Sequence, residues 1–510
     1  MNPQKMDRRK FLQRSALPGS AAALALCAYG SAAPAGSSAA LNCTRQIPVA
    51  EAYDVVVCGG GPSGCAAALA ARREGLNVLL VEGQSQLGGM ATSGLVSHWL
   101  GGRTQNGDWV VGGLFRTLAQ EAASRGCAKI PELPKDRVYQ PHGWLPWFIH
   151  GIPLDPFAMA QFLDEKLLTA GVDLLLETRA IAAEVRHGQI THVVTQNKSG
   201  LEAVRAAAVI DATGDADLAA LSGCEVQVGR EADGLMTPAS LTFHLYNVDH
   251  QVLGQAIETG KTPKFREKIQ ELRQKGEWPF PYDIFITVQL VQPDVVMVNT
   301  MRLPGVNGID GRSRTKGLVE GRKEAFELLK IFRKHFPGFQ NAQMKAVAAL
   351  LGIRETRRIK GDFSLRVADL REGPELPDTV GFSMYGWDLP DPHRPSVQPL
   401  VDESTGKYID KVQKTLSTPI PYRILVPRPV TNLLCPGRAV SVERDVLGPL
   451  RVMAPCMAMG EACGTAAAQM VRDKIAAADV SVPRLKARLR EMGAIVDRQA
   501  LPVIPPRQDP

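Results

Sequence analysis

Two stretches near the front of the chain are continuously apolar rather than alternating. Residues 54–58 read DVVVC and residues 77–81 read NVLLV. Runs of this kind are typical of strands buried on both faces, as in a parallel sheet. Between them, residues 66–74 are rich in alanine and stop at Gly75, which predicts a helix that ends at a glycine. The order strand, helix, strand predicts a βαβ unit.

Further along, apolar residues recur at helical spacing over residues 155–170. We expect short strands over residues 172–177, 180–186, 190–195 and 203–211, with His187 and Gly188 forming a hairpin turn. Residues 97–155 show little periodicity. Later segments predict strands over 240–246, 285–290, 294–299 and 432–437, a helix over 315–336, and irregular proline-rich structure over 373–428. A further helix, rich in small residues, is predicted within 450–468, with its N-terminus near 455–458.

The turn between the first strand and helix carries the spacing G-x-G-x-x-G at Gly59, Gly61 and Gly64, with Pro62 and Ser63 between the last two. Gly59 permits a tight turn, Gly61 lets the backbone approach a pyrophosphate, and Gly64 allows close packing of helix and strand. The helix N-terminus would face the phosphates. Glu82, at the end of the second strand, is placed to bind ribose hydroxyls and disfavours a 2′-phosphate. This combination predicts dinucleotide binding.

Three further segments point to FAD by resemblance. The loop after Glu82, which contains Gly88, Gly89 and Met90, resembles the loop that many FAD-dependent oxidoreductases place after the ribose-binding acid, although a surface loop is the alternative. A strand that breaks at Ala212, Thr213, Gly214 and Asp215 resembles a second FAD-contact motif; an ordinary turn is the alternative. A third segment combines Gly437 and Arg438 with a small-residue helix containing Gly460, whose N-terminus could face the flavin N1–C2=O edge or simply pack tightly.

Together with the unusual residues 351–361, these segments resemble the bacterial FAD-dependent oxidoreductases of the xanthan-lyase-like branch, within the glutathione-reductase-like flavoproteins. The resemblance implies an α/β fold: a Rossmann-like FAD-binding domain, with a parallel sheet plus a β-meander, and an inserted α+β substrate domain. We expect residues 50–224 and 430–475 to form the FAD-binding domain, 225–429 the substrate or cap domain, and 476–510 a C-terminal tail. The resemblance fixes no substrate.

Candidate catalytic groups are fewer. Arg354, Arg357 and Arg358, with Glu355, could clamp a carboxylate or carbonyl, because arginine offers planar bidentate donors; an interdomain salt-bridge network is the alternative. His98 and His244 are candidate bases or else structural histidines. Arg444 stands where many relatives carry a histidine, which replaces a possible base by a permanent cation.

The N-terminus predicts export. Residues 7–13 read DRRKFLQ, a twin-arginine signal, and an alanine-rich region and small residues follow, so residues 1–35 are expected to be a cleaved leader that engages the export machinery. The alanine-rich region is too short for a comfortable membrane span. A basic tail on a cytoplasmic protein is the alternative. We therefore expect a periplasmic or secreted protein.

Charge and cysteine content exclude other classes. The formal net charge is +7, of which the first 35 residues carry +4, and no dense basic run follows, so nucleic-acid binding is not indicated. The nine cysteines form no C-x-x-C, and no metal site is expected.

The expected activity is hydride transfer between FAD and a small organic substrate. Because the sequence has no second G-x-G-x-x-G unit for a nicotinamide, a quinone, a periplasmic electron carrier or oxygen is the expected electron partner. A flavin-assisted lyase or hydrolase acting on saccharides and a noncatalytic flavin-binding protein are the alternatives.

Overall fold

The computed structural model describes residues 44–104, 106–132, 141–142, 151–260, 265–370, 376–396 and 417–503, with backbone only at 141, 142, 258 and 260. The predicted leader lies outside these residues. All elements below belong to one unit, Pro48–Pro510. Within the described residues, no helix combines the length and apolar character needed to cross a membrane.

The predicted βαβ unit is confirmed. Strand β1 (Val49–Cys58) pairs in parallel with β2 (Val78–Val81), and helix α1 (Pro62–Arg73) connects them. Gly75 follows the helix with φ +81°. Strand β1 begins earlier than predicted because β9 (Gly200–Asp211) pairs along it from Val49 onward.

The main sheet has the order β6-β2-β1-β9-β8-β7, and β18 (Leu433–Leu434) also pairs with β9. Strands β7 (Arg179–Arg186), β8 (Gln189–Asn197) and β9 are antiparallel neighbours. The predicted hairpin turn is confirmed, since His187 and Gly188 have φ values of +50° and +75°. The strand predicted over residues 172–177 forms as β6 (Asp173–Leu175). Unlike β7, β8 and β9, which pair with one another in antiparallel fashion, β6 pairs in parallel with β2.

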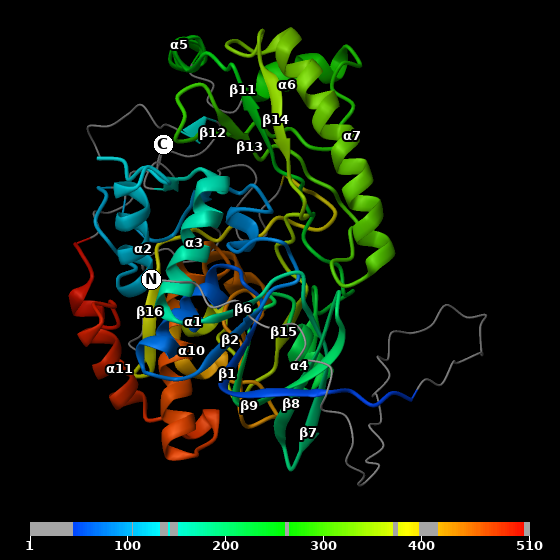
Figure 1. Cartoon of the computed structure of the whole chain (residues 1–510). Coiled ribbons are helices and arrows are strands. Elements are labelled where there is room, and N and C mark those ends of the chain that lie inside the picture. Colours follow the sequence, from blue (N-terminus) through cyan, green and yellow to red (C-terminus); the bar gives the residue numbers. More distant parts are fainter. Residues whose placement is uncertain are drawn as a thin grey trace, which may run out of the picture. The chain divides into compact units, whose positions relative to one another are not determined.

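The two faces of this sheet bury different side chains of β1. Val55 and Val57 lie in a large apolar core with α1, α2 (Gly113–Ser124), α3 (Pro156–Ala170), α10 (Met453–Asp473) and α11 (Val482–Glu491). Val56 and Cys58 face a smaller core with α4 (Asp217–Leu221). Figure 1 shows α1 and α10 together beside β1 and β2.

A second sheet has the order β14-β11-β13-β12-β4. Its strands are β4 (Pro141–His142), β11 (Phe243–Tyr246), β12 (Thr287–Gln289), β13 (Val296–Val298) and β14 (Gln343–Val347). The long helix α7 (Gly311–His335) runs beside it (Figure 1), and α5 (His250–Gly260) and α6 (Arg266–Gln274) complete this region. Its separate apolar core is rich in phenylalanine. The division into FAD-binding and substrate domains stays a prediction.

The remaining elements are short. They are β3 (His98–Trp99), β5 (Ile152–Pro153), β10 (Val226–Val228), β15 (Arg357–Ile359), α8 (Val367–Leu370), β16 (Thr379–Ser383), β17 (Thr418–Pro421) and α9 (Leu447–Leu450). Three differences from the sequence analysis stand out. Helix α2 lies where little periodicity was seen, β16 and β17 pair within the proline-rich region, and the expected tail contains α11, whose Leu485 and Leu489 are buried.

Candidate functional site

The three glycines of the first turn have three different surroundings. Gly59 has φ +105°, and a Cβ there would lie 2.5 Å from the carbonyl oxygen of Ala212. A Cβ on Gly64 would lie 1.7 Å from the carbonyl oxygen of Gly59, so helix and turn are in backbone contact. A Cβ on Gly61 would meet nothing within 4 Å. Open space therefore lies where the sequence places the pyrophosphate.

Glu82 lies at the carboxyl end of β2, directly beside this turn. Its Oε2 accepts a hydrogen bond from the Gly60 N–H at 2.5 Å, and its Oε1 accepts one from the Gln84 N–H at 2.7 Å. Burial raises the pKa of the carboxyl group, while the backbone donors act in the opposite direction. These bonds fix the carboxylate at the sheet edge.

The loop after Glu82 folds back onto the glycine turn. The Gly88 N–H donates to the carbonyl oxygen of Gly60 at 2.8 Å, and a Cβ on Gly89 would lie 3.0 Å from the Gly61 Cα. The Met90 side chain packs over Gly94, where a Cβ would be 2.3 Å from the Met90 Cε. The structure thus brings Gly88 and Gly89 to the open space at Gly61.

The second and third predicted motifs meet at the same edge. A Cβ on Gly214 would lie 3.1 Å from the Arg438 Nε, and Arg438 forms an ion pair of 2.6 Å with Asp215. Thr213 donates through both its N–H and its hydroxyl group to the buried Asp211. Gly437, with φ +94°, lies against Ser63 in the first turn of α1.

Helix α10 packs directly on α1. A Cβ on Gly460 would lie 2.1 Å from the carbonyl oxygen of Ser63. No side chain caps the N-terminus of either helix, whereas Asp155 and Asp310 cap α3 and α7. Two helix N-termini, close to Gly61 and to Gly437, are therefore available to an anionic or electron-rich ligand.

The two predicted histidine bases are buried. The Nε2–H of His244 donates to the carbonyl oxygen of Leu95 at 3.0 Å, and Nε2 also lies 3.4 Å from the Ser97 hydroxyl group. Burial lowers the pKa of His244 to about 4, which keeps it neutral. Ser97 directly precedes His98, the first residue of β3, so this contact brings the two histidine segments together. The Nδ1 of His244 is buried and has no hydrogen-bond partner among the described residues, and a role of His244 as a base stays a prediction.

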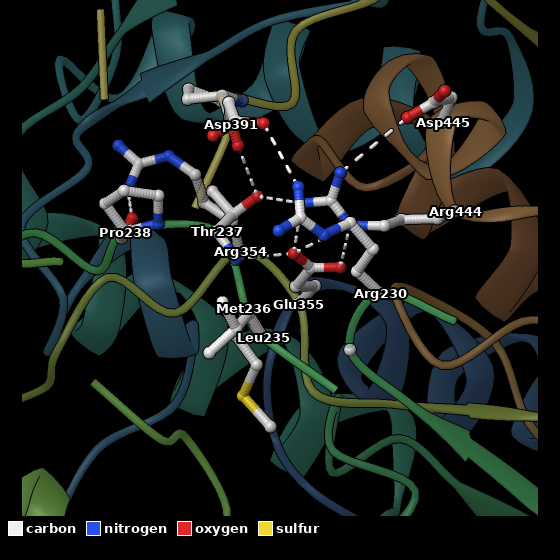
Figure 2. A network of polar contacts seen from close by, with 12 residues as sticks. Arg230, Leu235, Met236, Thr237, Pro238, Arg354, Glu355, Asp391, Arg444 and Asp445 are labelled. Atoms are coloured by element: carbon white, nitrogen blue, oxygen red, sulfur yellow. Dashed lines mark hydrogen bonds and ion pairs between the residues drawn. The ribbon is translucent and has the colours of Figure 1, made fainter. Parts of the chain in front are cut away.

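Three residues of the expected clamp, and the separate candidate Arg444, bind to other protein groups. The Arg444 guanidinium forms a bidentate pair with Glu355, with Nη2 to Oε1 at 2.6 Å, and Glu355 also accepts from the Thr237 N–H (Figure 2). Arg357 pairs with Asp217 at 2.8 Å, and Arg358 pairs with Glu231 at 2.6 Å. This geometry favours a buried salt-bridge network over a substrate clamp for Glu355, Arg357, Arg358 and Arg444.

Arg354 differs from its neighbours. Its side chain points away from the Glu355–Arg444 pair (Figure 2), and its Nη1 donates to the carbonyl oxygen of Pro238 at 2.7 Å. It lies near two arginines that the sequence analysis did not select, Arg302 and Arg451. Arg451 immediately precedes the N-cap residue of α10, a position that could have drawn attention to it. The described residues hold no group of three or more His, Cys, Asp or Glu that could bind a metal ion.

A family model described as FAD dependent oxidoreductase matches residues 54–489. Among curated proteins, digeranylgeranylglycerophospholipid reductase 2 of Methanopyrus kandleri is 27% identical over 217 residues, which are 42% of this chain and 48% of that protein. The chain thus spans about half the length of this curated relative.

Two solved structures are similar over most of the chain. A geranylgeranyl bacteriochlorophyll reductase-like protein from Thermoplasma acidophilum has a TM-score of 0.41 and 14% identity, covering 87% of this chain and 83% of that one. The p-nitrophenol 4-monooxygenase of Pseudomonas putida has a TM-score of 0.41 and 12% identity, and the match covers 86% of this chain and 85% of that one.

Proposed function

Because this chain belongs to the FAD dependent oxidoreductase family, we propose that it is an exported enzyme that transfers a hydride between FAD and a small organic substrate. The cofactor and the redox class follow from the family. The hydride transfer, the export and the kind of substrate are the proposal.

The residues at the sheet edge fit FAD. We assign the pyrophosphate to the space at Gly61 and to the N–H groups of Ser63 and Gly64 at the start of α1, with Gly88 and Gly89 on its other side. Glu82 is assigned to the adenosine ribose. The segments at Ala212–Asp215 and at Gly437–Arg438 close the same edge. The observation that carries the proposal is the space at Gly61 beside an uncapped helix N-terminus.

The flavin ring is assigned to the N-terminus of α10. Its first turn is uncapped, and its helix dipole would stabilise negative charge at the N1–C2=O edge. Bound FAD supplies two-electron redox chemistry at its N5 position. Because α10 is buried along most of its length and packs on α1, it would hold the ring in a fixed orientation.

Two sequence features support the export and the electron partner. The twin-arginine motif at residues 7–13 supports transport of a folded protein, and a periplasmic location removes access to the cytoplasmic nicotinamide pool. We propose a quinone, a periplasmic carrier or oxygen as the electron partner.

Anaerobic spectroscopy of the purified holoprotein tests this function. Yellow protein that is bleached by one class among alcohols, amines, hydroxy acids and sugars, with matching oxidised product, supports it. Bond cleavage in a saccharide without net electron transfer would favour the lyase, and absence of bleaching by every substrate and reductant would favour a noncatalytic flavin protein. Efficient flavin reduction by NADPH would contradict the proposed electron partner.

A further inference from the structure

A second group of side chains, which the FAD assignment does not use, gathers beside the start of α10. We call Arg302, Arg354 and Arg451 the arginine cluster. Tyr385 and Asp388 accompany it: the Tyr385 hydroxyl donates to Asp388 Oδ2 at 2.8 Å, and Arg451 Nη2 donates to the same oxygen at 3.0 Å. Leu303 and Ala239 exchange backbone hydrogen bonds of 2.7 and 3.0 Å, so Arg302, which precedes Leu303, lies across from Pro238, whose carbonyl oxygen Arg354 binds. In keeping with this arrangement, burial, then Arg302 and Arg451, lower the pKa of Arg354, while Asp388 and Tyr385 raise it.

The arginine cluster and its neighbours carry more positive than negative charge, and two of the arginines are buried. Arg302 is 7% exposed and Arg354 is 8% exposed. Neither forms an ion pair with any residue in the described part of the chain; their hydrogen bonds go to carbonyl oxygens, those of Asn299 and Met301 for Arg302 and that of Pro238 for Arg354. Asp388 is the one carboxylate among the five groups. Within these five described groups, three guanidiniums and one carboxylate sum to a charge of about +2, which is costly away from water unless a ligand compensates it.

Donors in the cluster are still unused. Arg302 Nε and Arg451 Nε are buried and have no hydrogen-bond partner among the described residues. Buried guanidinium N–H groups nearly always have a hydrogen-bond partner, because a buried donor without a hydrogen bond costs free energy. Planar guanidiniums with free edges match the two oxygens of a carboxylate or the oxygens of a phosphate.

The cluster lies next to the proposed flavin position. Arg451 precedes Val452, the N-cap residue of α10. A Cβ on Gly101 would touch Val452 at 2.8 Å, Pro455 at 3.2 Å and Tyr385 at 3.3 Å, so these residues surround one point at the first turn of α10. A ligand held by the cluster would be within reach of a ring placed at that turn.

We propose that the arginine cluster binds an oxyanion group of the substrate, a carboxylate or a phosphate, and so makes the enzyme selective for organic acids or their phosphorylated counterparts. This inference rests on the proposed function, since it takes the flavin to lie at α10. Arg302 and Arg354 supply the uncompensated charge, and Arg451, already partnered by Asp388, orients the ligand toward the ring.

The test is an anion titration of the FAD-loaded full-length protein at constant ionic strength, with chloride as the balancing salt. Acetate, succinate, inorganic phosphate and sulfate are the probes, and the flavin difference spectrum and calorimetry are the two readouts. We expect saturable binding with a spectral change. Preference for acetate or succinate would identify a carboxylate, and preference for phosphate or sulfate a phosphorylated substrate.

Variants locate the binding. R302M and R354M are each expected to weaken anion binding on the order of 10- to 100-fold, because a hydrogen bond to a charged group is lost, with FAD content unchanged. R302K keeps the charge and should have an intermediate effect, and R484M, at an exposed arginine paired with Asp473, should have none.

Three outcomes would overturn the inference: no saturable anion binding to yellow wild-type protein, binding that R302M and R354M leave unchanged, or loss of FAD as their main effect. If R302M and R354M fail to fold, the wild-type titration can still overturn the inference, and R302K, which keeps the charge, locates the binding. Colourless wild-type protein would instead refute the proposed function itself.

Discussion

Glu461 carries a carboxyl group into the main apolar core. Its Oε2 accepts the Leu114 N–H at 2.9 Å and so caps the start of α2, and Arg73 is 3.7 Å from Oε1. Burial raises the pKa of Glu461 to about 7. The folded protein therefore holds this proton at pH values where the unfolded chain has released it, and folding stability should fall as pH rises from about 4.5 to about 7.

We predict that E461Q removes this pH dependence. The amide oxygen can still accept from Leu114, and no buried charge forms. The free energy of unfolding of the wild type should fall by up to roughly 3 kcal/mol between pH 5 and pH 8, and that of E461Q should not show this fall. Apparent melting temperatures measured across that range check this, with E320Q at an exposed glutamate as the control. Parallel pH profiles for wild type and E461Q would refute the assignment.

The Glu355–Arg444 pair is the second buried ionic feature. Glu355 is 1% exposed and Arg444 is 4% exposed, so removal of either partner leaves a buried charge without its counterion. We predict that E355Q and R444M each destabilise by about 3–5 kcal/mol, and that the double variant costs clearly less than the sum. Denaturant unfolding of the four proteins measures the coupling. Additive effects would mean that the pair contributes little as a pair.

At the scale of elements, the contact between α1 and α10 depends on two glycines one turn apart. A Cβ on Gly464 would lie 2.2 Å from the carbonyl oxygen of Ala67, as one on Gly460 would meet that of Ser63. The two backbones touch, and this contact places the N-terminus of α10 beside the glycine turn. The sequence analysis recognised small residues in α10 but could not identify the surface they meet.

We predict opposite effects for two glycine substitutions. G464A should destabilise the apoprotein by about 1–3 kcal/mol, because the added methyl group forces the helices apart. G61A should leave apoprotein stability unchanged, since φ −71° and ψ −174° suit alanine and the Cβ enters open space. It should instead weaken FAD binding at least ~10-fold by occupying the pyrophosphate position. Unfolding curves and FAD titrations of both variants separate the effects, and a G61A protein with normal FAD affinity would refute the assignment.

Helix α2 shows why the local hydrophobic pattern was not enough to predict every helix from the sequence. Leu114, Phe115, Leu118 and Ala122 have helical spacing, yet the helix starts at Gly113 with φ +54° and has no local capping side chain. Its cap comes from Glu461, far along the sequence. Without a start signal of the usual type, the segment gave no clear prediction.

At the scale of the whole molecule, local patterns predicted many of the helices and strands in both sheet regions, but they did not predict the arginine cluster. The glycine turn, Glu82 and the strands around them are adjacent in sequence. The residue type at each of these positions can be explained by the local backbone conformation or by its place at the end of a strand. The arginine cluster is different: Arg302, Arg354 and Arg451 come from separate segments, and no spacing links them. Of these three arginines, the sequence pattern indicated only Arg354. It indicated Arg354 as part of a clamp with Arg357 and Arg358, whose side chains bind other groups in the structure. Long-range assembly, rather than composition, builds this cluster.

The same long-range assembly bears on export. The proposed FAD site joins Gly61, Glu82, Gly437 and the start of α10, so the cofactor can bind only after most of the chain has folded. FAD is made in the cytoplasm, and a route that carries folded proteins would deliver the loaded enzyme. We predict that R8K/R9K abolishes export, leaving yellow, uncleaved protein in the cytoplasm, whereas K10Q exports normally. Immunoblots of periplasmic and cytoplasmic fractions, with flavin fluorescence of each, measure this. Processed R8K/R9K protein in the periplasm would show that another route carries it.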